Sequence, residues 1–128
     1  MLLKRNETTD IVEVVYDSSN ILSSTFNKLT NELQIVFGKG DTYSYESVNP
    51  TDYLRFELAE SQGKVFNSHI KKYPFKKTIT IDPITLITEA AKLRAEEAKA
   101  LVDRKEKVLV NYMKTLLAGP STNQITDI

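Results

Sequence analysis

A single long helical run, from Asp82 to Gly119, most constrains what this chain can fold into. Asp82 can cap the first turn, Pro83 suits the first helical position, and Gly119-Pro120 ends the run. The run predicts one helix of about 35 residues, which spans roughly 50 Å at 1.5 Å per residue. Residues 1–82 can form only a small domain, so we expect the helix to extend beyond it.

The first eighty residues follow a different pattern, in which apolar side chains tend to recur at every second position. Runs rich in β-branched and aromatic residues, separated by turn-forming Asp, Asn, Ser and Gly, are typical of strands joined by tight turns. The predicted strands are residues 11–16, 21–26, 32–37, 42–45 and, after a basic connector at 71–77, 78–81. We therefore expect an antiparallel meander of three or four strands, with one further strand or extended arm.

Two short helices are predicted after the meander. Asn49 can cap the first, with Pro50 at its first position, and Ser61 can cap the second. The apolar stripe of the first helix would consist of Tyr53, Leu54, Phe56 and Leu58. The predicted fold class is α+β: a small antiparallel β-meander with two short helices, followed by one long C-terminal α-helix. The expected domains are a module at residues 1–82, an oligomerising helix at 83–119 and a flexible tail at 120–128.

Composition argues against several functional classes. The 128-residue chain has 17 basic and 17 acidic residues, so only a local patch could attract nucleic acid or an anionic membrane. The chain has no cysteine and one histidine, His69, which leaves little material for thiol catalysis or a metal site. We expect no enzyme activity, metal or cofactor. No run has the length of a membrane span or the pattern of a signal peptide, so we expect a cytoplasmic protein without a membrane partner.

One face of the long helix is apolar and favours self-association. Its residues recur at spacings of three, four or seven, and its first half is rich in alanine. Soluble proteins rarely leave such a face exposed to solvent. The alternative is that the helix folds back onto its own sheet, where this face would be ordinary core. We expect a homo-oligomer. The predicted interface residues are Ala91, Ala95, Ala98, Val102, Leu109, Tyr112, Met113 and Leu116.

Several spaced motifs between Asp17 and Phe75 resemble the KTSC domain family. They are Ser18-Ser19-x-Ile21, Phe37-x-x-Gly40-x-x-Tyr43-x-Tyr45, Val48-x-Pro50-x-x-Tyr53, Ala59-x-Ser61-x-Gly63-x-x-Phe66-Asn67-x-x-Ile70 and Tyr73-Pro74. The resemblance implies a small α+β module with no settled enzymatic activity. The family takes its name from a module at the C-terminus of some lysyl-tRNA synthetases, which suggests RNA as one partner. Members tend to carry arginine where this chain has Lys71-Lys72, and lysine is less suited than arginine to bidentate hydrogen bonding with phosphate.

The stretch after Ser61 is the best candidate for an anion or nucleotide site. A helix start offers free N–H groups, and lysines follow it closely. The candidate ligand-binding residues are Ser61, Gly63, Lys64, Asn67, His69, Lys71, Lys72 and Tyr73. A purely structural reading stays open, in which Ser61 caps the helix, Gly63 supplies a backbone angle and the lysines are solvated surface.

Two functions follow from these patterns. In the first, a non-enzymatic protein, oligomeric through its C-terminal helix, binds RNA, DNA or a nucleotide at a basic rim. In the second, the protein is a regulator, of the kind that phages encode, whose apolar helix face contacts and modulates a host protein. Salt separates them, because phosphate contacts weaken steeply with ionic strength and apolar contacts do not.

Overall fold

The computed structural model describes residues 1–118, and the predicted tail at 120–128 lies outside the described residues. The chain divides into two compact units, Met1–Arg94 and the part from Ala95 onward. The boundary between the units lies inside the long helix, so the first turns of that helix belong to the same unit as the sheet.

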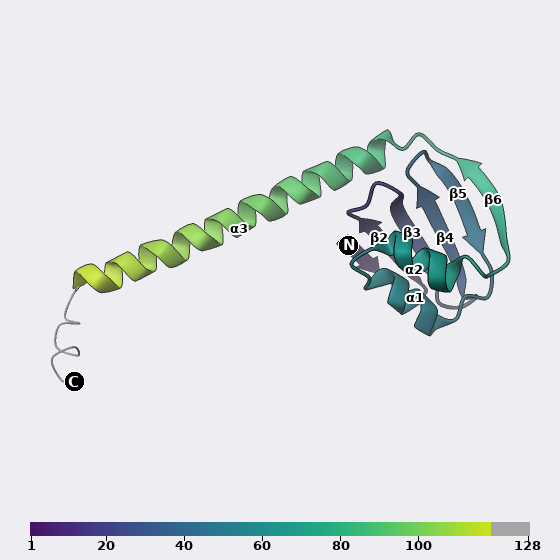
Figure 1. The fold of residues 1–128 in the computed structure, drawn as a ribbon, viewed down its shortest axis with the longest axis horizontal. Coiled ribbons are helices and arrows are strands. Elements are labelled where there is room, and N and C mark those ends of the chain that lie inside the picture. Colours follow the sequence, from purple (N-terminus) through teal and green to yellow (C-terminus); the bar gives the residue numbers. More distant parts are fainter. Residues whose placement is uncertain (119–128) are drawn as a thin grey trace. The chain divides into compact units, whose positions relative to one another are not determined.

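The first unit is built on a six-stranded sheet in which each strand pairs with the next one along the chain, always antiparallel (Figure 1). The strands are β1 (Leu2–Glu7), β2 (Ile11–Tyr16), β3 (Ile21–Asn27), β4 (Glu32–Phe37), β5 (Asp41–Tyr45) and β6 (Phe75–Thr80). The predicted α+β class is confirmed. β1 was not predicted, and β6 begins inside the segment expected to be a connector, so that expectation is wrong for residues 75–77.

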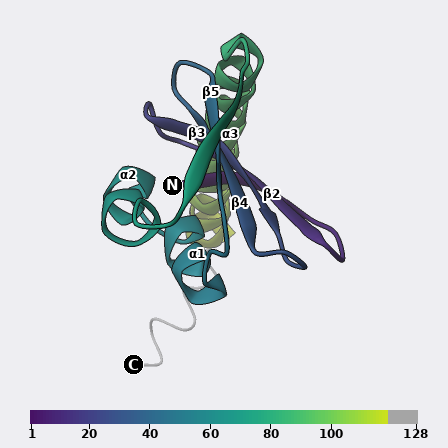
Figure 2. The ribbon, with the colours of Figure 1, turned by 90° about the vertical axis from the view of Figure 1, so that its right-hand side faces the viewer.

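One face of the sheet carries the core, and the short helices α1 (Pro50–Glu57) and α2 (Gln62–Val65) lie on this same side (Figure 2). The helical path continues from α2 into a π-helical turn, η1 (Phe66–Ile70). Alternation along the strands buries Val12, Val14, Tyr16, Leu33, Ile35 and Tyr45 against Tyr53, Phe56 and Ile70. The expected stripe of α1 is partly wrong: Leu54 and Leu58 are 47% and 73% exposed, because only one face of a two-turn helix can meet the sheet.

The opposite face of the sheet is partly covered by the first turns of α3 (Ile84–Ala118). Asp82 lies just before this helix, and its side chain accepts a hydrogen bond from the Ile84 amide at 3.0 Å, as expected of a capping residue. An irregularity in β3 between Ile21 and Ser23 accompanies the burial of Leu22, which lines the same cavity as Ala90 of α3.

The β4–β5 turn fixes the path into α3. Gly40 has a φ of 94°, and a Cβ there would overlap the carbonyl oxygen of Ile81. The Gly40 carbonyl also accepts a hydrogen bond from the Ile81 amide at 2.9 Å. The glycine therefore allows the segment after β6 to pass directly beside the turn.

Candidate functional site

The eight predicted ligand-binding residues lie on α2, on η1 and in the turn that follows. Ser61 caps α2, and its hydroxyl accepts a hydrogen bond from the Lys64 amide at 3.4 Å. Because α2 has four residues and its free amides are partly used by this cap, it gives little support to the predicted anion site at a helix start.

Gly63 is not explained by its backbone angle. Its φ lies outside the left-handed range, and a Cβ built at this position would meet no atom within 4 Å. The expectation that this glycine supplies an unusual backbone angle is therefore wrong. A glycine with open space beside it leaves the backbone accessible to a molecule that approaches from outside.

Tyr73 and Lys72 are both tied to the start of α1. The Tyr73 hydroxyl donates to Asp52 Oδ2 at 2.5 Å and accepts from the Asn49 amide at 3.2 Å. Lys72 Nζ lies 3.2 Å from the same Asp52 oxygen. The hydrogen bond from Tyr73, together with Lys72, lowers the pKa of Asp52. Tyr73 is thus a link between two elements, and part of the Lys72 charge is already balanced.

His69 also joins elements of the domain. Its Nδ1 lies 2.6 Å from the Ser68 hydroxyl, and its Nε2 lies 3.0 Å from Arg55 of α1. Both ring nitrogens have partners on the protein, which leaves none of the ring's hydrogen-bonding capacity for a ligand.

Lys64, Asn67 and Lys71 are the predicted residues that remain available. All three side chains are exposed and follow one another at helical neighbour spacing. Within residues 1–118, neither Lys64 nor Lys71 lies within ion-pair distance of a carboxylate. We call these three residues the basic rim. The structure thus brings three of the eight predicted residues together as a free polar surface.

An aromatic cluster lies on the core face where β4, β5, β6 and η1 meet. Ring centroids 5.4 to 5.9 Å apart join Phe37, Tyr43, Tyr45, Phe66 and Phe75. Phe75 is 61% exposed, whereas burial raises the pKa of Tyr45 to about 12. The rings mainly pack on one another, so Phe75 is the member best able to stack on a ligand.

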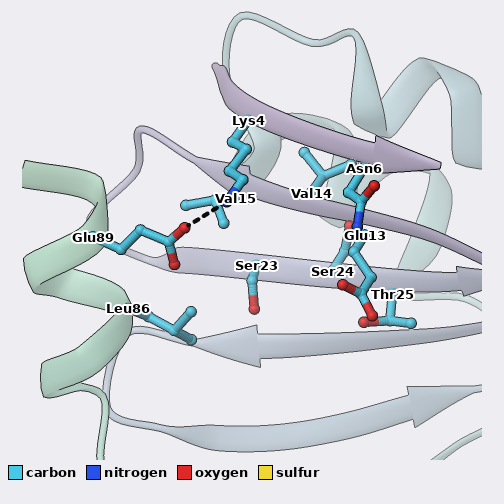
Figure 3. Close-up of a pocket in the computed structure, with 10 residues that line it drawn as sticks. All are labelled: Lys4, Asn6, Glu13, Val14, Val15, Ser23, Ser24, Thr25, Leu86 and Glu89. Carbon is cyan, nitrogen blue, oxygen red and sulfur yellow. Dashed lines mark hydrogen bonds and ion pairs between the residues drawn. The ribbon is translucent and has the colours of Figure 1, made fainter. Parts of the chain in front are cut away.

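Sequence reasoning missed a shallow cavity of about 300 Å³ on the sheet face beside α3 (Figure 3). Leu86 and Glu89 of α3 face Val15, Ser23 and other strand residues across it, and Lys4 of β1 forms an ion pair with Glu89 at 3.3 Å. A neighbouring cavity of about 370 Å³ lies where Arg94 pairs with Asp17 at 2.8 Å. No local pattern marks these cavities, because they form only where α3 returns to the sheet.

An ion pair between a partly exposed arginine and a buried glutamate was missed as well, because β1 was not predicted. Glu57 of α1 is 2% exposed and accepts hydrogen bonds from Arg5 at 3.0 Å and from the Tyr53 hydroxyl at 2.8 Å. Burial raises the pKa of Tyr53, which therefore stays a neutral donor. The Arg5–Glu57 contact attaches the first strand to the helical layer.

The predicted oligomer interface lies along α3. Its residues are all exposed within the described chain: Ala91, Ala95, Ala98, Val102, Leu109, Tyr112, Met113 and Leu116. Leu101, Val108, Val110 and Leu117 add further exposed apolar surface.

Two other features bear on the kind of site. Within residues 1–118, no three His, Asp or Glu side chains gather as metal ligands would. Nor is any helix in this range long and apolar enough to cross a bilayer.

The comparisons with known proteins place the recognisable part of the chain at its centre. The family model of the KTSC domain matches residues 17–75. The crystal structure of a KTSC domain protein from Yersinia pestis is similar, with 28% sequence identity and a TM-score of 0.50, over 59% of this chain and 97% of that one. No curated protein is significantly similar to the chain. Residues 17–75 therefore form a KTSC domain; in this chain β1 and β2 precede these residues, and the rest of β6 and α3 follow them.

Proposed function

We propose that the protein is a non-enzymatic binding protein that self-associates through residues 95–118 of α3 and binds an acidic ligand, a nucleic acid or a nucleotide, on its KTSC domain. We call residues 95–118 the assembly helix. The observation that carries the proposal is the exposure of its large apolar side chains, among them Leu109, Tyr112 and Leu116. Such a surface is typical of a helix that another helix covers.

Ligand binding rests on the basic rim and its surroundings. Lys64 and Lys71 are free of ion pairs in the described chain, Gly63 leaves backbone open beside them, and Phe75 offers an exposed ring on the same domain. Two lysines make a weak phosphate contact, so several domains held together would bind one polyanion much more tightly than a single domain. Self-association and ligand binding thus support each other.

The first test is the mass of the protein in solution by light scattering, recorded with the absorbance ratio at 260 and 280 nm. An oligomer that carries nucleotide or nucleic acid supports the proposal. A monomer at micromolar concentration contradicts the assembly part of it.

The ligand part is tested by binding to a fluorescent single-stranded oligonucleotide. Lys71→Glu should weaken binding about tenfold and flatten its salt dependence, because one phosphate contact becomes repulsive. Lys39→Glu, the same charge change in the β4–β5 turn, is the matched control and should have little effect. Equal effects of the two variants would show that only overall charge matters.

The apolar face of the assembly helix also supports a second candidate, a regulator that binds another protein. An apolar surface of Leu101, Val108, Leu109 and Tyr112 lies beside Arg104 and Lys105 on this helix, which suits an amphipathic partner helix with acidic flanks. A monomeric protein without bound nucleotide would favour this candidate over the first.

A further inference from the structure

The assembly helix is unequal along its length, and this asymmetry bears on how two copies would pair. Ala95 and Ala98 lie on the apolar face at its start, whereas Leu109, Tyr112 and Leu116 lie on the same face toward its end. All five side chains are exposed. The inference drawn from this pattern rests on the proposed self-association.

The face follows the seven-residue repeat of packed helices. Ala95, Val102, Leu109 and Leu116 are seven residues apart and occupy one position of the repeat, while Ala98, Lys105 and Tyr112 occupy the other. Lys105 is the one charged residue in this set. Its location therefore helps to distinguish the possible orientations of two helices.

Parallel pairing would bring each residue opposite itself. Ala98 would face Ala98 while Leu116 faced Leu116, so the two helices would need to be close at one end and far apart at the other. Lys105 would also face Lys105 within the contact. Mismatched packing and like charges both oppose this arrangement.

Antiparallel pairing matches small residues with large ones. When Ala98 lies opposite Leu109 of the second copy, Ala95 lies opposite Tyr112 and Val102 lies opposite Lys105. The spacing between the helices then stays even, and each lysine packs its aliphatic stem on a valine while its ammonium group reaches water.

The flanking positions agree with the same register. In an antiparallel pair with Ala98 opposite Leu109, Lys99 of one copy lies beside Glu106 of the other, and Leu101 lies beside Val108. Both contacts occur twice because the pair has a two-fold axis. Moving the register by one repeat, so that Ala98 faces Leu116, would instead bring Glu106 beside Glu106.

We infer that the assembly helix binds a second copy of itself in antiparallel orientation, with Ala98 opposite Leu109 and Lys99 beside Glu106. The points where the first units join their helices then lie at opposite ends of the contact. An antiparallel pair presents its two KTSC domains to separate segments of one ligand or to two ligands.

The absence of cysteine makes disulfide formation a clean test. Full-length Ala98→Cys and Leu109→Cys proteins are prepared separately, mixed under reducing conditions and oxidised, and the linked peptides are identified by mass spectrometry. The expected product links residue 98 of one copy to residue 109 of the other. Links of 98 to 98 and 109 to 109 would overturn the inference, as would 98 to 116 in an Ala98→Cys and Leu116→Cys mixture.

Charge exchange gives a second test that leaves the apolar contact intact. Lys99→Glu should weaken self-association about tenfold, since two attractive contacts become repulsive, and adding Glu106→Lys should restore it. Parallel helices do not bring these residues together, so an absence of rescue contradicts the antiparallel register. A monomeric wild-type protein would contradict the proposed self-association itself. An oligomer that forms links of 98 to 98 and 109 to 109 would contradict only the antiparallel orientation.

Discussion

The same residue types have opposite environments in the two units of this chain. Leu33 of β4 is fully buried, whereas Leu109 of the assembly helix is 57% exposed. Both lie in regular secondary structure with apolar neighbours at the expected spacing. In the first unit the apolar face is covered by other parts of the same chain, but the assembly helix has no such cover within the described residues. Regular patterning therefore predicts an apolar face without telling which molecule will cover it.

The largest expected effect on folding comes from truncating the covered side chain. Leu33→Ala should lower the free energy of unfolding by about 2–5 kcal/mol, because it removes buried contacts and leaves a cavity. Leu109→Ala should leave the unfolding of the sheet within about 0.5 kcal/mol of wild type. Denaturant titration followed by circular dichroism and by tyrosine fluorescence compares the two. Similar losses would mean that Leu109 is also core.

The converse experiment acts on assembly. Leu109→Asp with Met113→Asp should dissociate the oligomer, since two exposed apolar side chains become charged and resist burial. The mass in solution should fall to that of one chain, while the unfolding midpoint of the sheet is unchanged. Lys107→Asp with Lys114→Asp is a control elsewhere on the helix and should leave the mass unaltered. If the first variant lost the folded sheet, that result would instead show that these side chains of the helix also stabilise the sheet.

Two glycines sharpen the contrast between covered and open positions. Gly40→Ala should destabilise the first unit by about 1–3 kcal/mol, because Gly40 has a positive φ and no room for a Cβ beside Ile81. Gly63→Ala should be neutral or stabilise by up to about 1 kcal/mol, since alanine favours helix and the space is open. Thermal unfolding measures both. A drop in oligonucleotide affinity for Gly63→Ala, without lost stability, would place the ligand at Gly63.

A smaller effect than that of Gly40→Ala is expected at Tyr73, the predicted site residue that contacts the start of α1. Tyr73→Phe should cost about 1 kcal/mol through loss of the hydrogen bond to Asp52. The pKa of Asp52 is lower in the folded state, so its contribution is present above the unfolded value near pH 4 and lost as pH falls through the folded value. The free energy of unfolding, measured from pH 6 to pH 3, should therefore fall less steeply with falling pH for Tyr73→Phe than for the wild type. Parallel curves would mean that the hydrogen bond has little effect on Asp52.

Not every element could be predicted from its own residues. β1 alternates poorly and consists largely of charged and exposed side chains, so its strand character comes from pairing with β2. Residues 75–77 read as a basic connector because two of them are lysines, yet the pairing of Phe75 with Tyr45 makes them part of β6. β6 is an edge strand that pairs with a neighbour on one side only. Its exposed lysines therefore do not show the alternation of apolar and polar residues that marks a strand with one buried face.

The candidate site shows the same division. The sequence located the basic stretch after Ser61, but its residues differ in role according to neighbours on α1. Tyr73 and His69 are bound to Asp52 and Arg55, while Lys64 and Lys71 are free within the described chain. Asp52 lies 21 positions from Tyr73 and Arg55 lies 14 positions from His69, so no local spacing reveals these partners.

By itself the sequence determined the local structure: the predicted meander, the cap of α1 at Asn49, the start of the long helix after Asp82 and the apolar face along it. Capping and periodicity act between near neighbours, so they can be read directly. Only the tertiary structure decided which charges are paired, as Arg5 and Glu57 are across 52 positions, and which apolar side chains are covered. The reason is physical: burial and ion pairing depend on groups that meet only when the chain has folded.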